Sequence, residues 1–317
     1  MNVDKDTYRK FCRETSQLSV FIRDWWLDAV CGEDNWDVVL EEKNQTIITA
    51  LPFYKVKKGM FKGITLPPLT PHLGPYIFYP PDQKYSSKLS YEKEIMSNLI
   101  EKLPRFDFFV QSFSPSFTNW LPFYWKGFLQ TTRYTYILDD LTDPDRLISD
   151  FSHEKRKNLK RAEQILTVRS DWTPDEFYTH HKSSLAKTGQ KINYSPELFR
   201  RIVQAAMEHH AGRIVYAIDE KGVVHGALFI VWDENSGYDL VSTIDPDLRS
   251  SGSIALLIKE MLIYLSSRTK SFDFEGSMIE NVENSFRHFG AKQIPYFKIM
   301  KYNSMILRII KGIRHNA

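Results

Sequence analysis

Two stretches of the chain carry alternating apolar and polar residues on either side of a short polar turn. The first covers residues 36–56 with its turn at 43–45, and the second covers residues 213–232 with its turn at 220–222. Alternation with a period of two places one face of a strand in the core and the other in solvent. The pattern therefore predicts two β-hairpins, and residues 237–244 predict a further strand after the second one.

A helical pattern follows each predicted hairpin. Residues 90–103 and 253–268 carry apolar side chains every three or four positions, which is typical of an amphipathic helix. Each of these helices leads into a short aromatic strand, at 106–110 and at 272–275. Three more helices are predicted before the second hairpin, at 151–166, 174–186 and 196–210.

The two halves of the chain repeat the same order of elements. The aromatic strands, and the segments 119–127 and 284–292 behind them, lie about 165 residues apart in pairs. In each half we expect a short helix and a last strand to follow the aromatic strand. Any two α/β halves share part of such an order, but the nearly fixed offset favours internal duplication, although the hairpin turns are offset by about ten residues more. We interpret the chain as two copies of one unit, a first domain at 1–133 and a second at 134–317.

Composition narrows the classes of protein to which the chain can belong. The chain has 317 residues, enough for two domains, and 14% of them are aromatic, which excludes disorder throughout. The only cysteines, Cys12 and Cys31, exclude a disulfide framework and a cysteine-rich zinc site. A net charge of +3 is too mild to indicate nucleic-acid binding by itself. We see no secretory signal, and prolines interrupt the long uncharged stretches, so we expect a cytoplasmic protein.

The second half carries motifs of a known fold. Its predicted elements come in the order helices, hairpin, strand, helix and strand. The aromatic strand ends in the motif Asp273-Phe-Glu-Gly276, and the motif Phe286-Arg-His-Phe-Gly290 follows it. This arrangement resembles the GNAT acyltransferase fold. Duplicated, and with a strand at 134–138 and a basic helix at 155–161, it resembles the FemABX group of aminoacyl transferases over essentially the whole chain. The resemblance implies an α/β fold class with mixed sheets, in two tandem GNAT-like domains.

The resemblance also implies a place for the donor. GNAT proteins hold acyl-CoA at a Gln/Arg-x-x-Gly-x-Gly/Ala motif that begins a helix, where backbone N–H groups bind the pyrophosphate. Here the motif reads Arg249-Ser-Ser-Gly252-Ser253-Ile254, and the isoleucine departs from it. In the FemABX group the donor is an aminoacyl-tRNA, so acyl-CoA and aminoacyl-tRNA are both possible donors for this chain. The alternative is that the motif binds no ligand and only caps the helix. The expected donor-binding residues are Thr243, Arg249, Ser251, Gly252 and Ser253.

Acyl transfer to an amine requires a group that removes a proton and a group that stabilises charge on the carbonyl oxygen. Glu275 and Asp273 lie at a predicted strand end, where α/β sheets often open into a site, and we expect their side chains to point to opposite faces. Arg287 could hold a carboxylate or phosphate, or pair with Glu283 four residues earlier. Tyr238 is a candidate proton donor. Glu275, Asp273, Arg287 and Tyr238 are therefore the candidate catalytic residues.

The first copy and the basic helix supply candidates for substrate binding. The proline-rich segment 67–75 predicts a rigid loop that could line an acceptor groove between the copies. The cations at 155–161 could bind a phosphate of tRNA, a nucleotide sugar or CoA, or simply form a solvated face. The candidates are Trp25, Lys55, Thr70, His72, Gln111, Arg133, Lys155 and Arg156. No metal is expected, because adjacent histidines diverge on a helix and no His-Glu-x-x-His motif occurs.

Together these patterns predict an N-acyltransferase that moves an acyl or aminoacyl group from acyl-CoA or aminoacyl-tRNA to an amine acceptor. The resemblance suggests a cell-envelope precursor as that acceptor. The alternative is a non-catalytic GNAT-fold protein that binds a cell-wall or polysaccharide intermediate. The amphipathic segment 303–315 could lie on an anionic membrane surface, such as the inner face of the cell membrane, or dock on its own domain. The sequence does not identify the oligomeric state.

Overall fold

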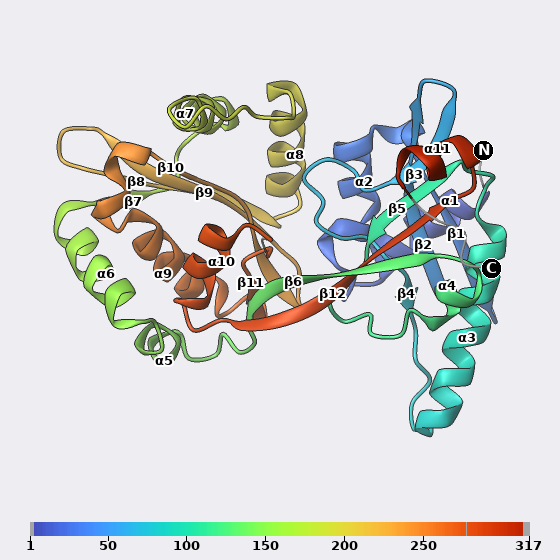
Figure 1. Cartoon of the computed structure of the whole chain (residues 1–317). Helices are drawn as coiled ribbons and strands as arrows, with labels where there is room; N and C mark the ends of the chain where they lie inside the picture. The colour runs from blue at the N-terminus through green and yellow to red at the C-terminus, as the bar shows by residue number, and fades with distance from the viewer. Residues whose placement is uncertain (1–2, 277, 313–317) are drawn as a thin grey trace. The chain divides into compact units, whose positions relative to one another are not determined.

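The computed structural model describes residues 3–276 and 278–312 (Figure 1). The chain divides into two compact units. Unit 1 comprises Met1–Arg133 with Pro295–Ala317, and unit 2 comprises Tyr134–Ile294. Each unit has a hydrophobic core of its own.

Unit 1 is built on a β-hairpin that extends into a mixed sheet. The strand order is β1-β2-β3-β5-β12, with β4 paired to β2. β3 and β5 run parallel, so the chain must cross over between them, and helix α3 lies in that crossover. The strands are β1 (Trp36–Lys43), β2 (Thr46–Lys58), β3 (Phe61–Thr65), β4 (Tyr76–Ile77), β5 (Phe108–Ser112) and the end of β12 (Lys292–Tyr302). The helices are α1 (Val3–Glu14), α2 (Asp24–Cys31), α3 (Tyr85–Lys102), α4 (Leu121–Trp125) and α11 (Met305–Ile310).

Aromatic rings fill the core of unit 1, which accounts for much of the aromatic content of the chain. Phe109 meets Phe128 edge to face with ring centroids 5.3 Å apart, and Phe113 meets Phe123 at 5.1 Å. The quadrupole of each ring favours this edge-to-face packing. α3 closes the core with one apolar face that includes Leu99.

In unit 2 the strand order is β6-β11-β10-β9-β8-β7, with parallel and antiparallel pairs. Its strands are the end of β6 (Leu129–Leu138), β7 (Thr167–Arg169), β8 (Gly212–Ile218), β9 (Val224–Trp232), β10 (Ser236–Ile244) and β11 (Ser271–Asp273). Its helices are α5 (Pro144–Ser149), α6 (His153–Ile165), α7 (Pro174–Ala186), α8 (Pro196–Glu208), α9 (Ser253–Leu265) and α10 (Glu280–Arg287). β10 and β11 are parallel, and α9 provides the crossover between them.

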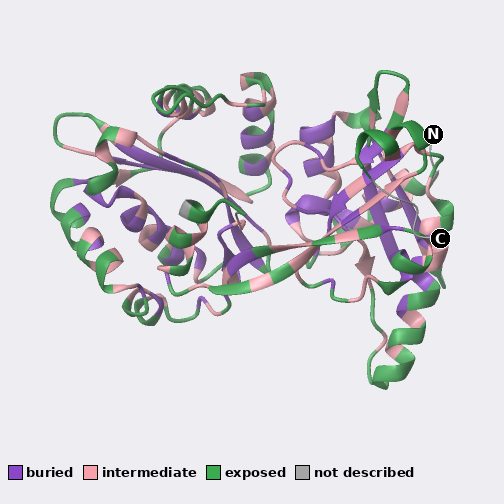
Figure 2. Ribbon diagram, viewed as in Figure 1, coloured by how far each residue is buried: buried purple, intermediate pink, exposed green. Residues whose placement is uncertain are grey.

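Helix α9 is the central helix of unit 2. Eight of its 13 residues are buried, and they face several directions rather than one. A helix that is apolar on most of its surface must be covered on more than one side. α9 packs on β8 and β9 on one side and on α6 on another, and Figure 2 shows the buried residues gathered along α9 and the strands beneath it.

The hairpins, the third strand and the helices predicted from the periodicity are confirmed, with α7 at the predicted residues.

The repeat does not predict how the last strand of each half pairs. β12 pairs with β5, so residues from Pro295 onward group with unit 1, although the sequence placed them in the second domain. Reciprocally, β6 follows α4 of the first copy but pairs with β11 in unit 2. A repeat fixes the order of elements, not the sheet edge that a last strand joins.

The amphipathic segment expected at 303–315 is helical over a shorter range. α11 covers Met305–Ile310, and residues 313–315 of the expected segment lie outside the described residues. None of the helices in the described part of the chain is both long and apolar enough to cross a bilayer.

The pairing of β12 with β5 makes a testable prediction for stability. Ile299 of β12 is fully buried in the core of unit 1, so Ile299→Ala should lower the free energy of unfolding by about 2–5 kcal/mol. Ile309→Ala removes the same atoms from an exposed side chain and should change it by less than about 0.5 kcal/mol. Urea denaturation followed by circular dichroism measures both; equal losses would contradict the assignment of β12 to this core.

Candidate functional site

The candidate site lies in unit 2, where two parallel strands part. β10 and β11 pair only through residues 236–238 and 271–273. β11 then ends, whereas β10 continues to Ile244 after a bulge between Asp239 and Val241. A pocket of about 160 Å³ opens beside the unpaired part of β10. Its polar wall is Asp239, Ser242 and Thr243, and its apolar wall includes Ile254, Ile258 and Phe286.

A hydrogen-bond network fixes the turn that follows β11. The Thr135 hydroxyl of β6 donates to Asp273 Oδ1 and accepts the N–H of Gly276 at 2.9 Å. The N–H of Glu275 donates to the same Asp273 oxygen at 2.7 Å. At Gly276 a Cβ atom would lie 1.8 Å from the carbonyl oxygen of Tyr134, so β6 admits only glycine there. The network holds Glu275 at a φ of 55°, in the left-handed region that side chains seldom adopt.

The buried carboxyls of this region are close enough to repel one another. Burial raises the pKa of Asp239 to about 6 and that of Asp273 to about 6, although both accept hydrogen bonds. Burial raises the pKa of Glu275 well above its ordinary value, and the negative charges of Asp273 and Asp239 raise it further. The expectation that Asp273 and Glu275 point to opposite faces is wrong, because alternate residues of a strand share a face and these two carboxyls interact.

Asp239 has an oxygen that the fold leaves unsatisfied. Its Oδ2 accepts a hydrogen bond from Ser242 at 2.5 Å, whereas its buried Oδ1 has no hydrogen-bond partner among the described residues. No cation of the described chain contributes to the pKa of Asp239, Asp273 or Glu275. Leaving a buried carboxylate oxygen unpaired costs free energy, so the pocket wall is prepared for a donor or a positive charge.

Lys155 contacts two residues that line the pocket. Ser152 caps α6 and places Lys155 in its first turn, with its Nζ 3.0 Å from Ser285 Oγ and 4.1 Å from the ring centroid of Phe289. Ser285 and Phe289 both line the pocket. Burial lowers the pKa of Lys155 to about 8. The amine therefore exchanges a proton near neutral pH, as a general base or acid requires.

Comparisons with known proteins agree with this geometry. Residues 149–275 match the family model of the acetyltransferase (GNAT) domain, and no curated protein matches the chain. The crystal structure of FemX is similar, with a TM-score of 0.69 over 98% of each chain at 10% identity. A tandem GNAT protein from the clavulanic acid biosynthesis pathway is similar with a TM-score of 0.53 over 95% of each chain at 9% identity.

The chain has the fold of tandem GNAT proteins, and its residues 149–275 match a GNAT domain. The resemblance found in the sequence is thereby confirmed, and so is the fold class. The C-terminal domain of a putative lysylphosphatidylglycerol synthetase from Agrobacterium fabrum shares the fold, with a TM-score of 0.54 over 98% of this chain and 95% of that one at 11% identity. The matched GNAT domain contains β10, α9 and β11. The pocket lies where the two strands, β10 and β11, diverge.

A GNAT domain suggests an acyl-CoA donor, and the start of α9 tests this suggestion. A pyrophosphate there needs backbone N–H groups open to solvent. Ser251 and Ser253 are buried, and a Cβ atom on Gly252 would lie 2.2 Å from the carbonyl oxygen of Asn158 in α6. Arg161 of α6 donates to the carbonyl oxygen of Ser250 at 2.6 Å. α6 therefore covers the start of α9, and this covered helix start does not fit a bound pyrophosphate. Of the other expected donor-binding residues, Arg249 is exposed and Thr243 lines the pocket.

The structure places the remaining catalytic candidates away from the pocket. Tyr238 donates its hydroxyl hydrogen to Asp233 at 3.2 Å. Arg287 donates to Asn284 and lies 4.0 Å from Glu283, the i−4 pairing that the sequence offered as an alternative. Of the two substrate-binding candidates on α6, Lys155 contacts the pocket lining, while Arg156 donates to the carbonyl oxygens of Ser149 and Phe151.

Three of the candidates in unit 1, Thr70, His72 and Gln111, are buried. Thr70 is buried, accepting a hydrogen bond from Trp26 at 3.1 Å, and Trp26 in turn contacts Trp25 edge to face. His72 is buried against Phe21, and burial lowers the pKa of His72 to about 4. Gln111 is fully buried, and its Oε1 has no hydrogen-bond partner among the described residues. Lys55 forms an ion pair with Asp37 at 3.4 Å. Arg133 is the last residue of the first segment of unit 1.

Sequence reasoning missed Asp239, Thr135 and Ser285. Asp239 carries the one signal that could have found it, an acid within the otherwise uncharged strand 236–244. Thr135 and Ser285 act through contacts with residues more than a hundred positions away, which no local pattern contains. No group of three or more His, Cys, Asp or Glu side chains within residues 3–276 and 278–312 is arranged to hold a metal ion.

Asp239 makes the stability of the protein depend on pH. Its pKa is higher in the folded state, so folding favours its protonated form, and the cost of ionising it grows as pH rises from about 4 to about 7. Asp239→Asn should therefore gain stability over the native protein, by about 2 kcal/mol more at pH 8 than at pH 4. Thermal unfolding across this range measures the gain.

Asp175→Asn is the matched control for this measurement. Asp175 is an exposed carboxylate that pairs with Arg200 on the surface of the same unit, so its replacement should change stability little at any pH. If Asp239→Asn raised the stability equally at pH 4 and at pH 8, ionisation of the buried Asp239 carboxyl would not destabilise the folded protein, which would contradict the prediction.

Proposed function

We propose that the protein is an N-acyltransferase whose pocket in unit 2 takes a donor acyl group that itself carries an amine. The GNAT fold supports acyl transfer, and the unsatisfied Asp239 Oδ1 on the pocket wall supports the amine. That oxygen is the single observation on which the choice of acyl group rests.

The charge of the pocket favours an ammonium group over a neutral acyl chain. Asp239 and Asp273 are mostly ionised at neutral pH, since the pKa of each is about 6, whereas the raised pKa of Glu275 favours its neutral form. A ligand ammonium would donate to the free oxygen and supply the missing positive charge, which a simple acetyl group cannot do. The apolar wall would contact the rest of the acyl group. A cavity of roughly 150 Å³ holds a molecule the size of benzene, so a pocket of about 160 Å³ suits a small aminoacyl group.

The covered start of α9 supports the same choice of donor. A pyrophosphate would have to displace α6 to reach the backbone N–H groups of Gly252 and Ser253, whereas an aminoacyl ester needs only the pocket. We therefore favour an aminoacyl-tRNA over acyl-CoA as the donor. In the reaction the acceptor nitrogen bonds to the acyl carbon, and the bond from that carbon to the donor oxygen breaks. The acceptor nitrogen loses a proton, which finally passes to the donor oxygen as it leaves as a hydroxyl group.

Lys155 is the residue that we propose to accept this proton. With a pKa of about 8 it is partly neutral under mildly alkaline conditions, and Ser285 links it to the pocket. The acceptor proposed from the resemblance to the FemABX group is an amine on a cell-envelope precursor.

Binding of small esters tests the proposed acyl group directly. We expect amino-acid methyl esters to raise the melting temperature of the full chain, and the matching esters that lack the amine to have no effect. Asp239→Asn should abolish the shift, because the neutral amide no longer balances an ammonium, whereas Asp175→Asn should retain it. Differential scanning fluorimetry measures these shifts.

The same assay contains the result that would overturn the proposal. Stabilisation by acetyl-CoA that Asp239→Asn leaves intact, with no response to amino esters, would show that the donor is acyl-CoA and that the carboxyl has another role. If neither donor class stabilises the chain, the site is not an acyl-binding site.

A further inference from the structure

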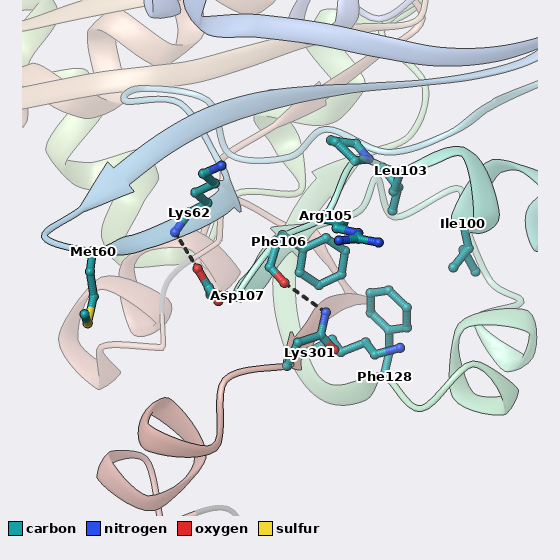
Figure 3. Close-up of a pocket in the computed structure, with 11 residues that line it drawn as sticks. Met60, Lys62, Ile100, Leu103, Arg105, Phe106, Asp107, Phe128 and Lys301 are labelled. Carbon is teal, nitrogen blue, oxygen red and sulfur yellow. Dashed lines mark hydrogen bonds between the residues drawn. The ribbon is translucent and has the colours of Figure 1, made fainter.

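Unit 1 contains a second pocket, which the proposed acyl transfer does not use (Figure 3). Its volume is about 570 Å³. Ile100, Phe106 and Phe128 form an apolar floor, and Lys62, Arg105 and Lys301 form a cationic rim. A pocket of this kind suits an amphiphilic anion, with a phosphate at the rim and carbon atoms on the floor.

Asp107 brings three separate segments of unit 1 together beside this pocket. Its Oδ2 accepts the N–H of Lys62 at 2.8 Å, which holds the β2–β3 hairpin. Its carbonyl oxygen accepts the N–H groups of Asn303 at 2.8 Å and of Ser304 at 3.3 Å, directly before α11. The hairpin tip with Met60, the segment 105–107 and the start of α11 therefore share one edge of unit 1 (Figures 1 and 3).

This edge is strongly basic. The described residues 57–62, 105–107 and 301–312 contain a single acid, Asp107, whose Oδ2 accepts the Lys62 N–H. Their cations are Lys57, Lys58, Lys62, Arg105, Lys301, Arg308 and Lys311. The side chains of Lys62 and Arg105 form no ion pair with any residue that the structure describes. Burial, and then the charges of Arg308 and Lys126, lower the pKa of Lys301, as expected in a positive field.

The same edge exposes large apolar side chains. Met60 at the hairpin tip and Met305, Ile306, Ile309 and Ile310 of α11 are each more than half exposed. Cations flanking exposed aliphatic groups are typical of proteins that lie on an anionic bilayer. A surface for single-stranded nucleic acid would instead expose aromatic rings between the cations, whereas Phe128 at this pocket is buried.

We propose that this edge of unit 1 docks on a bilayer that contains anionic lipids. α11 and Met60 enter the acyl-chain boundary, the cations face the headgroups, and the pocket holds the phosphate of one lipid between Lys62 and Arg105. The carbon atoms of that lipid's headgroup and glycerol lie on the floor formed by Phe106 and Phe128.

Sedimentation of the full chain with vesicles tests the proposal. The vesicles are phosphatidylcholine alone, and phosphatidylcholine with about one third phosphatidylglycerol. We expect binding to the anionic vesicles only. Removing two cations near an anionic surface, as in the double variant Lys62→Gln with Arg105→Gln, should weaken that binding about thirtyfold. Lys182→Gln with Lys191→Gln removes two exposed cations of unit 2 and should leave binding unchanged.

A second pair of substitutions tests the apolar part of the surface. Ile309→Ser with Ile310→Ser should also weaken binding to the anionic vesicles, with an unchanged melting temperature because both side chains are exposed. Several results would overturn the proposal. These are no binding of the native chain to anionic vesicles, equal losses for the unit 1 and unit 2 cation pairs, or binding that the isoleucine pair does not affect. Binding of tRNA that depends on Lys62 and Arg105, without vesicle binding, would make the edge a nucleic-acid surface instead.

Discussion

The parting of β10 and β11 is the constraint on which the candidate site depends. Two parallel strands that stay paired leave no room between them, and here the pairing stops after Tyr238 and Asp273. Thr135 holds the chain where β11 ends, by bonding Asp273 on one side and the N–H of Gly276 on the other. The position of Glu275, the space beside β10 and the exposure of Asp239 to that space all follow from where this one hydroxyl stops the strand.

The site is stabilised by its surroundings rather than by its own contacts. Three carboxyls without a cation, an unpaired carboxylate oxygen and a strained residue at Glu275 each oppose folding. The apolar helix α9 and the strands it covers supply the compensating burial. Such a concentration of unfavourable groups at one strand end is typical of a place where a ligand completes the electrostatics.

The sequence predicts the elements and the fold because both rest on local periodicity and on repeated motifs. The hairpin turns, α7 and the helical face of α9 can be predicted from residue spacing alone. The candidate site is less predictable. Glu275, Asp273 and Lys155 carry signals in a strand end and a charged helix. Asp239 differs only as the one acid of its strand, and Thr135 acquires its role from a contact across the sheet. For Thr70, His72 and Gln111 the sequence predicted binding residues, but the structure shows that these polar side chains are buried.

The exchange of last strands has a consequence for how the chain is made. β5 needs β12 to complete its sheet edge, and β12 leaves the ribosome almost two hundred residues after β5. Unit 2 is a single continuous segment, so it can close while the synthesis of unit 1 is still unfinished. The half of the protein that is translated first is therefore the half that is completed last, and until then the edge of β5 that receives β12 is unpaired.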